Sequence, residues 1–157
     1  MSTLAEAVSD FLARKRIAVA GVSRRKGQPA NLILKKLRDS GHEAFAVNPA
    51  AAEIDGERCY PNLESIPGGV EAVMIATHPD VTMRVVEECA DLGIKRVWMH
   101  RSFGRGSVSD EAVRLGRKAG LTVIDGACPM MFCKPVDPAH LCMRGILRLF
   151  GKLPRRV

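Results

Sequence analysis

The chain has 157 residues, of which 46% are hydrophobic and 26% charged, a composition that suits one globular domain with a substantial core. Its formal net charge is +7, but five of the seven excess charges follow Asp137, where basic residues occur without acidic ones, so the main body is nearly neutral. A basic stretch followed by an apolar run is absent from the amino terminus, and no apolar stretch could cross a bilayer, which argues against secretion and membrane insertion.

The first third of the chain predicts alternating helices and strands. Thr3 and Glu6 form a capping box, and apolar residues then recur at helical spacing: Leu4, Ala7, Val8, Phe11 and Leu12. A strand is expected at residues 17–20, followed by a helix that Pro29 begins and Gly41 ends. A second strand is expected at residues 44–47, where Asn48 and Pro49 end it.

The rest of the chain continues this alternation after a turn-rich stretch that contains Asp55-Gly56 and Pro67-Gly68-Gly69. Strands are expected at residues 72–76, 96–100 and 122–124, with helices between them that Gly93 and Gly120 end. The helix after residue 78 is expected to face the core with Val81, Val85, Cys89 and Leu92. Trp98 lies in a predicted strand, where packing in the core is the expected role.

This order of elements predicts an α/β fold. Short apolar strands separated by helices indicate a Rossmann-like parallel sheet of about five strands with helices on both faces. A further helix follows from Pro138, and its basic residues are Arg144, Arg148, Lys152, Arg155 and Arg156. We therefore predict a Rossmann-like domain over residues 1–137 and a basic C-terminal helix and tail over residues 138–157.

The loop after the first predicted strand is the best clue to function. A buried strand runs into a glycine-bounded basic turn and then a helix, the arrangement that binds the phosphates of a nucleotide. Gly21 permits the sharp turn, and Ser23 and the loop amides offer hydrogen-bond donors. The candidate ligand residues in this loop are Gly21, Val22, Ser23, Arg24, Arg25, Lys26, Gly27 and Gln28.

The first loop and the residue after the second predicted strand indicate which type of nucleotide binds. An NAD site has a Gly-x-Gly-x-x-Gly turn and an acidic residue after the second strand, whereas this chain has Gly-x-Ser-x-x-x-Gly and Asn48. A ligand with an additional phosphate, such as NADP or coenzyme A, explains the basic loop better.

The carboxyl ends of the other strands supply further candidates, because ligands of such sheets lie there. These candidates are Asn48, Pro49, Thr77, His78, Pro79, His100 and Arg101. His78 and His100 could act as acid or base, but no carboxylate is clearly placed to orient either ring, and Asp80 belongs more naturally to the first turn of a helix. We assign no catalytic residue.

The chain resembles a known family through an ordered set of segments. These are residues 17–23, 47–49, 56–61, 92–99 and 125–129, within a similarity that covers about residues 11 to 135. The set is similar to stand-alone CoA-binding domain proteins and to the CoA-binding domain of the succinyl-CoA synthetase alpha subunit. The resemblance implies that the phosphates of CoA lie on the turn at residues 21–28, with the adenosine end near residues 48–49 and 77–79. The synthetase's histidine-bearing second domain is missing, so its ligase chemistry is not carried over.

The remaining features concern thiols, metals and partners. Five cysteines without regular spacing favour reduced thiols in the cytoplasm. Zinc-type ligands gather at Cys128, Cys133, His140 and Cys142, but their spacing is irregular, and we expect ordinary thiols rather than a metal site. The basic C-terminal helix suits an acidic partner or membrane surface, or its apolar side packs on the sheet or on a second copy in a homodimer, which is the interpretation we favour.

We therefore expect a module that binds coenzyme A or an acyl-CoA without catalysis of its own. The alternatives are an NADP-dependent oxidoreductase and a nucleotide-sensing regulator. No helix-turn-helix pattern supports a nucleic-acid partner.

Overall fold

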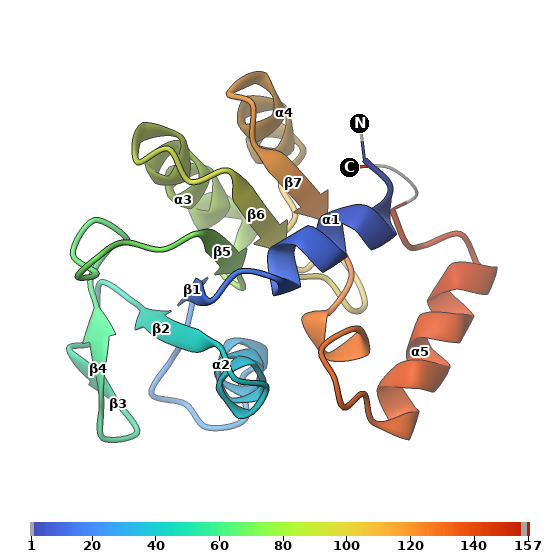
Figure 1. Cartoon of the computed structure of the whole chain (residues 1–157), viewed down its shortest axis with the longest axis horizontal. Coiled ribbons are helices and arrows are strands. Elements are labelled where there is room, and N and C mark those ends of the chain that lie inside the picture. The colour runs from blue at the N-terminus through green and yellow to red at the C-terminus, as the bar shows by residue number, and fades with distance from the viewer. Residues whose placement is uncertain (1, 155–156) are drawn as a thin grey trace.

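A seven-stranded sheet forms the centre of the molecule (Figure 1). The structure is a computed structural model that describes residues 2–154 and 157. The strand order is β3-β4-β2-β1-β5-β6-β7, and every pair is parallel except β3 with β4. The strands are β1 Arg16–Ala20, β2 Glu43–Val47, β3 Glu53–Ile54, β4 Glu57–Tyr60, β5 Ala72–Ile75, β6 Arg96–Met99 and β7 Thr122–Asp125.

The predicted α/β fold with its parallel sheet is confirmed. The five expected strands correspond to β1, β2, β5, β6 and β7, and they are neighbours in the sheet. Two short strands, β3 and β4, extend the sheet within the turn-rich stretch. They form a hairpin whose turn places Asp55 and Gly56 at positive φ. An Asp-Gly pair is a favoured two-residue hairpin turn, so this stretch adds an antiparallel edge to the sheet.

Helices cover both faces of the sheet, as right-handed connections between parallel strands require. Helices α1 and α2 pack on one face through a core cluster that includes Phe11 and Ile33, and α3 and α4 pack on the other with Val86 and Val113. The helices are α1 Leu4–Leu12, α2 Pro29–Asp39, α3 Pro79–Asp91, α4 Asp110–Lys118 and α5 Pro138–Leu149, with a short 3-10 helix, η1, at Pro129–Met131.

Trp98 on β6 is fully buried and packs against aromatic rings, which confirms its predicted role in the core. Its ring centroid lies 5.3 Å from that of Phe11 in an edge-on arrangement and 5.9 Å from that of Phe132. Its Nε1 donates a hydrogen bond to the carbonyl oxygen of Gly126 at 2.7 Å. This bond satisfies the buried indole nitrogen and joins β6 to the segment after β7.

The predicted buried face of α3 is partly wrong. Val81 and Leu92 are 45% and 43% exposed, whereas Thr82 is fully buried together with Val86 and Cys89. Thr82 is tolerated there because its Oγ1 donates to the carbonyl oxygen of Ser107 at 2.8 Å. A satisfied polar residue therefore occupies a core position that hydrophobicity alone assigns to a valine.

Helix α5 stands apart from the sheet and contacts it mainly through η1 (Figure 1). Leu147 is the one buried residue of this helix. The two ends of the chain meet where the backbone N–H of Val157 donates to the carbonyl oxygen of Ser2 at 3.0 Å. The predicted basic residues Arg155 and Arg156 lie outside the described residues, and the domain division at residue 137 stays a prediction. Across residues 2–154 and 157, none of the helices has the length and apolar character needed to span a membrane.

Candidate functional site

The strand order reverses at β1, because β2 lies on one side of it and β5 on the other. In open parallel sheets a ligand crevice forms at this point, beyond the carboxyl ends of the strands. Gly21, which follows β1, has φ +100°, and a Cβ at this position would lie 2.5 Å from the carbonyl oxygen of Ala76 after β5. Only glycine suits both the backbone conformation and this close approach.

The loop at residues 21–28 is held in shape by Asn31 in the first turn of α2. The backbone N–H of Ser23 donates to Asn31 Oδ1 at 3.0 Å, and Asn31 Nδ2 donates to the carbonyl oxygen of Ser23 at 2.7 Å. Ser23 Oγ also accepts a hydrogen bond from the backbone N–H of Arg25 at 3.1 Å. The loop is therefore fixed from within, and its polar side chains do not need a ligand to order them.

Asn48 joins the loops that follow β1 and β2. Its Nδ2 donates to the carbonyl oxygen of Val22 at 2.7 Å, and its Oδ1 accepts from the backbone N–H of Ala50 at 2.8 Å. Arg24 adds a second link by donating to the carbonyl oxygen of Ala50 at 3.1 Å. These bonds place Asn48 and Pro49 beside the basic loop and give the Asn48 amide a structural role in positioning it.

The N-terminus of α2 differs from those of the other α-helices within the described residues. Helices α1, α3, α4 and α5 begin with a side chain that accepts a hydrogen bond from a backbone N–H, whereas Gln28 before α2 makes no such bond. The first N–H groups of a helix have no partner within the helix and carry partial positive charge. The α2 terminus thus presents unused donors next to the basic loop.

Three exposed cations, Arg24, Arg25 and Lys26, extend this positive region. No ion pair joins them to a carboxylate in the part of the chain that the structure describes. The donors of α2 and these side chains therefore act together on an anion such as a phosphate.

The turn of Thr77, His78 and Pro79 follows β5 and begins α3. Thr77 Oγ1 lies 3.2 Å from Thr82 Oγ1, and Pro79 is buried in the first turn of the helix. The His78 ring is largely exposed, caps α3 by accepting from the backbone N–H of Asp80 at 3.4 Å, and lies 3.1 Å from an Asp80 carboxylate oxygen. The contact between Gly21 and Ala76 brings this turn to the same crevice.

Arg101, which follows β6, is oriented toward β7, whereas the backbone N–H of the neighbouring His100 donates to the carbonyl oxygen of Ile75 on β5 at 2.8 Å. The backbone N–H of Arg101 donates to the carbonyl oxygen of Ala127 at 3.1 Å, and its side chain donates to that of Asp125 at 3.2 Å. His100 is 9% exposed, and its Nε2 lies 3.2 Å from Ser102 Oγ. A cavity of about 490 Å³ lies beside Arg101 and Ser102. The candidate residues thus form two groups, one around β1, β2 and β5 and the other at the ends of β6 and β7.

Burial lowers the pKa of His100 below its ordinary value of 6.5. In the unfolded chain this ring takes up a proton near its ordinary pKa, while in the folded chain it stays neutral to lower pH. The free energy of unfolding should therefore fall as the pH drops from about 7 to about 5.

We expect His100→Gln to reduce this pH-dependent loss of the free energy of unfolding, measured from urea-unfolding curves at pH 7 and pH 5. If wild type and His100→Gln lose the same free energy of unfolding over this pH range, the assignment to His100 is wrong.

The zinc-type ligand residues that lie close together in the sequence have separate surroundings in the structure. Cys133 Sγ donates to Ser40 Oγ at 3.1 Å, His140 Nδ1 lies 2.5 Å from an Asp137 carboxylate oxygen, and Cys142 is exposed on α5. Burial raises the pKa of the Cys128 thiol and keeps it protonated. Across residues 2–154 and 157, no group of three His, Cys, Asp or Glu side chains could hold a metal ion.

Two residues that contact the candidate ligand-binding residues were not predicted from the sequence. Asn31 braces the basic loop, and its signal in the sequence is a short polar side chain two residues after the proline that begins α2, where such side chains often bond to nearby backbone. Ser102 contacts His100 across a single intervening residue, and no sequence pattern predicts that contact.

Comparison with known proteins relates this chain to one family. The sequence model of the CoA binding domain matches residues 15–134. The uncharacterized protein YneT of Bacillus subtilis is 30% identical over 122 residues, which cover 77% of this chain and 87% of YneT. A solved structure, a hypothetical protein from Pyrococcus horikoshii OT3, is 30% identical with a TM-score of 0.72 and coverage of 93% and 92% of the two chains. Acetate–CoA ligase (ADP-forming) I of Archaeoglobus fulgidus is 39% identical over 48% of this chain, but that match spans only 11% of the ligase.

Proposed function

The chain belongs to the CoA binding domain family, and on that basis we propose that it binds coenzyme A or an acyl-CoA at the carboxyl ends of β1, β2 and β5. The main evidence for this proposal is the basic loop at residues 21–28, which leads directly into the N-terminus of α2, where no side chain caps the helix. Coenzyme A has a pyrophosphate and a ribose phosphate, and these groups match a cluster of cations and unused N–H donors.

In the proposed position the ligand contacts both groups of candidate residues, the group around β1, β2 and β5 and the group at the ends of β6 and β7. The phosphates contact Arg24, Arg25 and Lys26, and the adenosine end lies between the Asn48-Pro49 corner and the turn at residues 77–79. The pantetheine arm then runs along the edge of the sheet toward His100 and Arg101 at the end of β6. This direction follows the strand order, because β6 lies next to β5.

We propose a binding role without catalysis, in the cytoplasm. His78 is engaged as a helix cap, and His100 is buried, with its ring nitrogen beside the hydroxyl of Ser102. All five cysteines are free thiols, which suits a reducing compartment. The ligase activity of the longer relatives is not part of this proposal.

Calorimetric titration of ligand-stripped protein tests the proposal. We expect saturable binding of CoA at one fixed salt concentration. Dephospho-CoA should bind about 10- to 100-fold more weakly, because it lacks a phosphate that makes charge-assisted hydrogen bonds. Palmitoyl-CoA and acetyl-CoA, compared in the same buffer, measure the preference for an acyl group.

NADP and NAD serve as competitors in the same titration. Binding of NADP with higher affinity than CoA would overturn the proposal in favour of the oxidoreductase, and hydride transfer to NADP would then be the next assay. Lack of binding by CoA and by every acyl-CoA would overturn it as well.

A further inference from the structure

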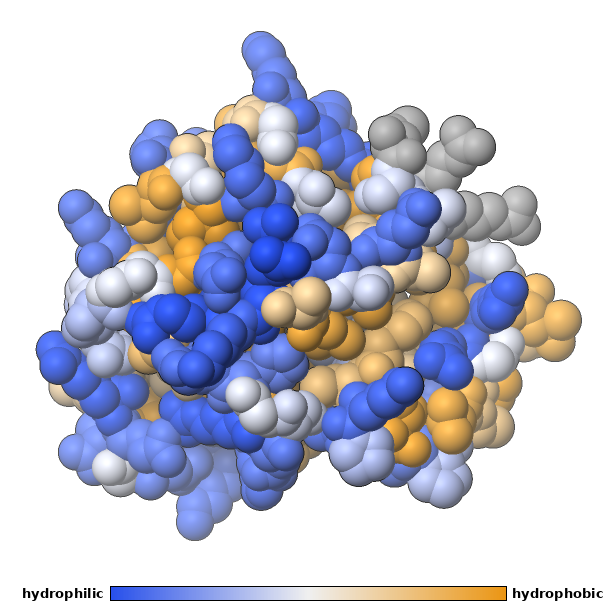
Figure 2. Space-filling model, viewed as in Figure 1, coloured by the Kyte–Doolittle hydropathy of each residue, from blue (hydrophilic) through white to orange (hydrophobic). Residues whose placement is uncertain are grey.

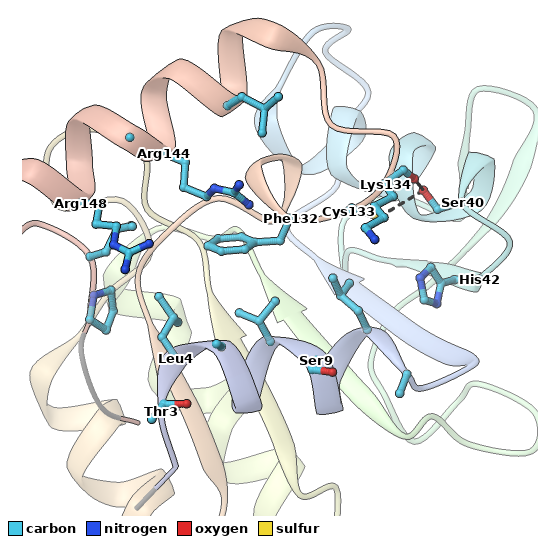
Figure 3. Close-up of a pocket in the computed structure, with 18 of the residues that line it drawn as sticks. Thr3, Leu4, Ser9, Ser40, His42, Phe132, Cys133, Lys134, Arg144 and Arg148 are labelled. Atoms are coloured by element: carbon cyan, nitrogen blue, oxygen red, sulfur yellow. Dashed lines mark hydrogen bonds between the residues drawn. The ribbon is translucent and has the colours of Figure 1, made fainter.

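A groove lies between α1 and α5, and at residues 151–154 it adjoins the smaller cavity beside Arg101. Its volume is about 1240 Å³, and the segment at residues 132–134 forms its floor between the two helices (Figure 3). None of the candidate CoA-binding residues lines it. An occupant of this groove would therefore contact a different set of residues from those proposed to bind CoA.

The middle of the groove is apolar. Its hydrophobic lining residues are Leu4, Val8, Leu12, Phe132, Leu141 and Leu153. Hydrophobic residues gather on the surface over the region between α1 and α5, with polar residues around them (Figure 2). Helix α5 leaves much of its own apolar surface unburied, since Leu141, Ile146 and Leu149 are 44%, 48% and 82% exposed. An apolar surface of this kind in a folded protein marks an interaction site.

The charged residues of the groove all have one sign. Among the described residues that line it, Lys134, Arg144 and Arg148 are cationic and none is acidic, and the imidazole of His42 also lines it. Arg144 and Arg148 extend from α5 toward α1 at one end of the groove, whereas Lys134 and His42 lie toward the other end (Figure 3). The groove therefore combines an apolar centre with positive charge at both ends.

Arg144 is held over the floor of the groove. Its Nη1 donates to the carbonyl oxygen of Met131 at 3.0 Å, and its guanidinium carbon lies 5.5 Å from the centre of the Phe132 ring. Its other N–H groups stay available, because a guanidinium has five donors. Arg148 is exposed and has no carboxylate partner among the residues that the structure describes. Both side chains can therefore bind carboxylates of an incoming partner.

The dimensions indicate the occupant. An α-helix of about three turns is roughly 16 Å long and 10 Å wide, which gives a volume close to that of the groove. Grooves between helices bind amphipathic helices through apolar residues at i, i+3, i+4 and i+7. A second copy placed by a two-fold axis would bring the same cations of α5 toward each other, so charge disfavours it. We propose that the α1–α5 groove is a docking site for an acidic amphipathic helix of another protein.

The test uses a synthetic helix and the single tryptophan of the chain. The probe is an acetylated, amidated peptide of about 14 residues, with leucines at i, i+3, i+4 and i+7 and glutamates at both ends. Trp98 packs on Phe132, a groove residue, so its emission should change when the groove fills. We expect saturable binding that weakens at high salt. A peptide of the same composition with scrambled leucines, and one with lysines in place of the glutamates, should bind at least about tenfold more weakly.

Charge-reversal variants locate the site. Arg148→Glu should weaken peptide binding at least about tenfold, because it places a carboxylate at the end of the groove that receives the glutamates. The matched control Arg114→Glu makes the same charge change at an exposed position of α4, on the opposite face of the sheet, and should bind like wild type. Leu141→Ser should also weaken binding, since it removes apolar contact. CoA titration of each variant should match wild type, which separates this result from the proposed function.

Several outcomes would overturn the proposal. These are no saturable binding of the acidic peptide, equal weakening by Arg148→Glu and Arg114→Glu, or equal affinity for the scrambled peptide. Binding of palmitate, measured by the same Trp98 emission, in the absence of peptide binding would assign the groove to a lipid. A concentration-dependent dimer that Leu141→Ser dissociates would assign it to a second copy of this chain.

Discussion

Replacing Gly21 with alanine is expected to lower the free energy of unfolding by about 2–4 kcal/mol. Gly21 has φ +100°, where a side chain is strained, and the new Cβ would lie 2.5 Å from the carbonyl oxygen of Ala76. That oxygen belongs to the backbone after β5, so relief of the clash must separate β1 from β5 at their carboxyl ends. Because the crevice lies at this point, CoA binding should be lost even in the fraction that stays folded.

Gly27 provides the matched control for this substitution. It lies in the same loop with φ +75°, but no atom lies within 4 Å of the Cβ position. Gly27→Ala therefore measures the backbone strain alone, about 1 kcal/mol. Urea-unfolding curves of both variants give the difference due to the close approach. An equal loss of stability in the two variants would show that the contact between Gly21 and Ala76 does not constrain the sheet.

The five neighbouring parallel strands β1, β2, β5, β6 and β7 could be predicted from the sequence because each is a short, largely apolar run with glycine or proline near its ends. The hairpin of β3 and β4 was not predicted, although its Asp55-Gly56 turn was noted, because β3 has only two residues and β4 begins with two charged ones, so neither is an apolar run. The face of α3 was misassigned for a different reason. Its hydrophobic pattern favours Val81 and Leu92, and the burial of Thr82 depends on a carbonyl oxygen 25 residues away, at Ser107.

The basic loop of the candidate site could also be predicted, since glycine, cations and a helix-opening proline lie within one short segment. The hydrogen bonds that the residues around this loop make could not be predicted. The position of Asn48 at the ligand stays a prediction, and the structure adds that its amide joins two loops. The α1–α5 groove was not predicted at all, because its walls are more than 100 residues apart in the sequence and meet only through tertiary packing.

Simultaneous replacement of Arg24, Arg25 and Lys26 by alanine is expected to weaken CoA binding about 100-fold. These side chains are exposed, and among the described residues the substitutions remove only the hydrogen bond of Arg24 to the carbonyl oxygen of Ala50. The free energy of unfolding should therefore change by less than about 1 kcal/mol. Calorimetry at two salt concentrations gives a second readout, because the variant should lose most of the salt dependence of CoA binding.

Net charge alone would also reduce the affinity for an anion, so the control removes equal charge elsewhere. Arg84, Arg114 and Lys118 are exposed on α3 and α4, which cover the opposite face of the sheet from α2. Their replacement by alanine also changes the net charge from +7 to +4. If CoA contacts the basic loop, this control should bind within about threefold of wild type, because screening removes most of the distant field. Equal losses in the two triple variants would instead mean that only the overall charge attracts CoA, and the assignment of its phosphates to the loop at residues 21–28 would fail.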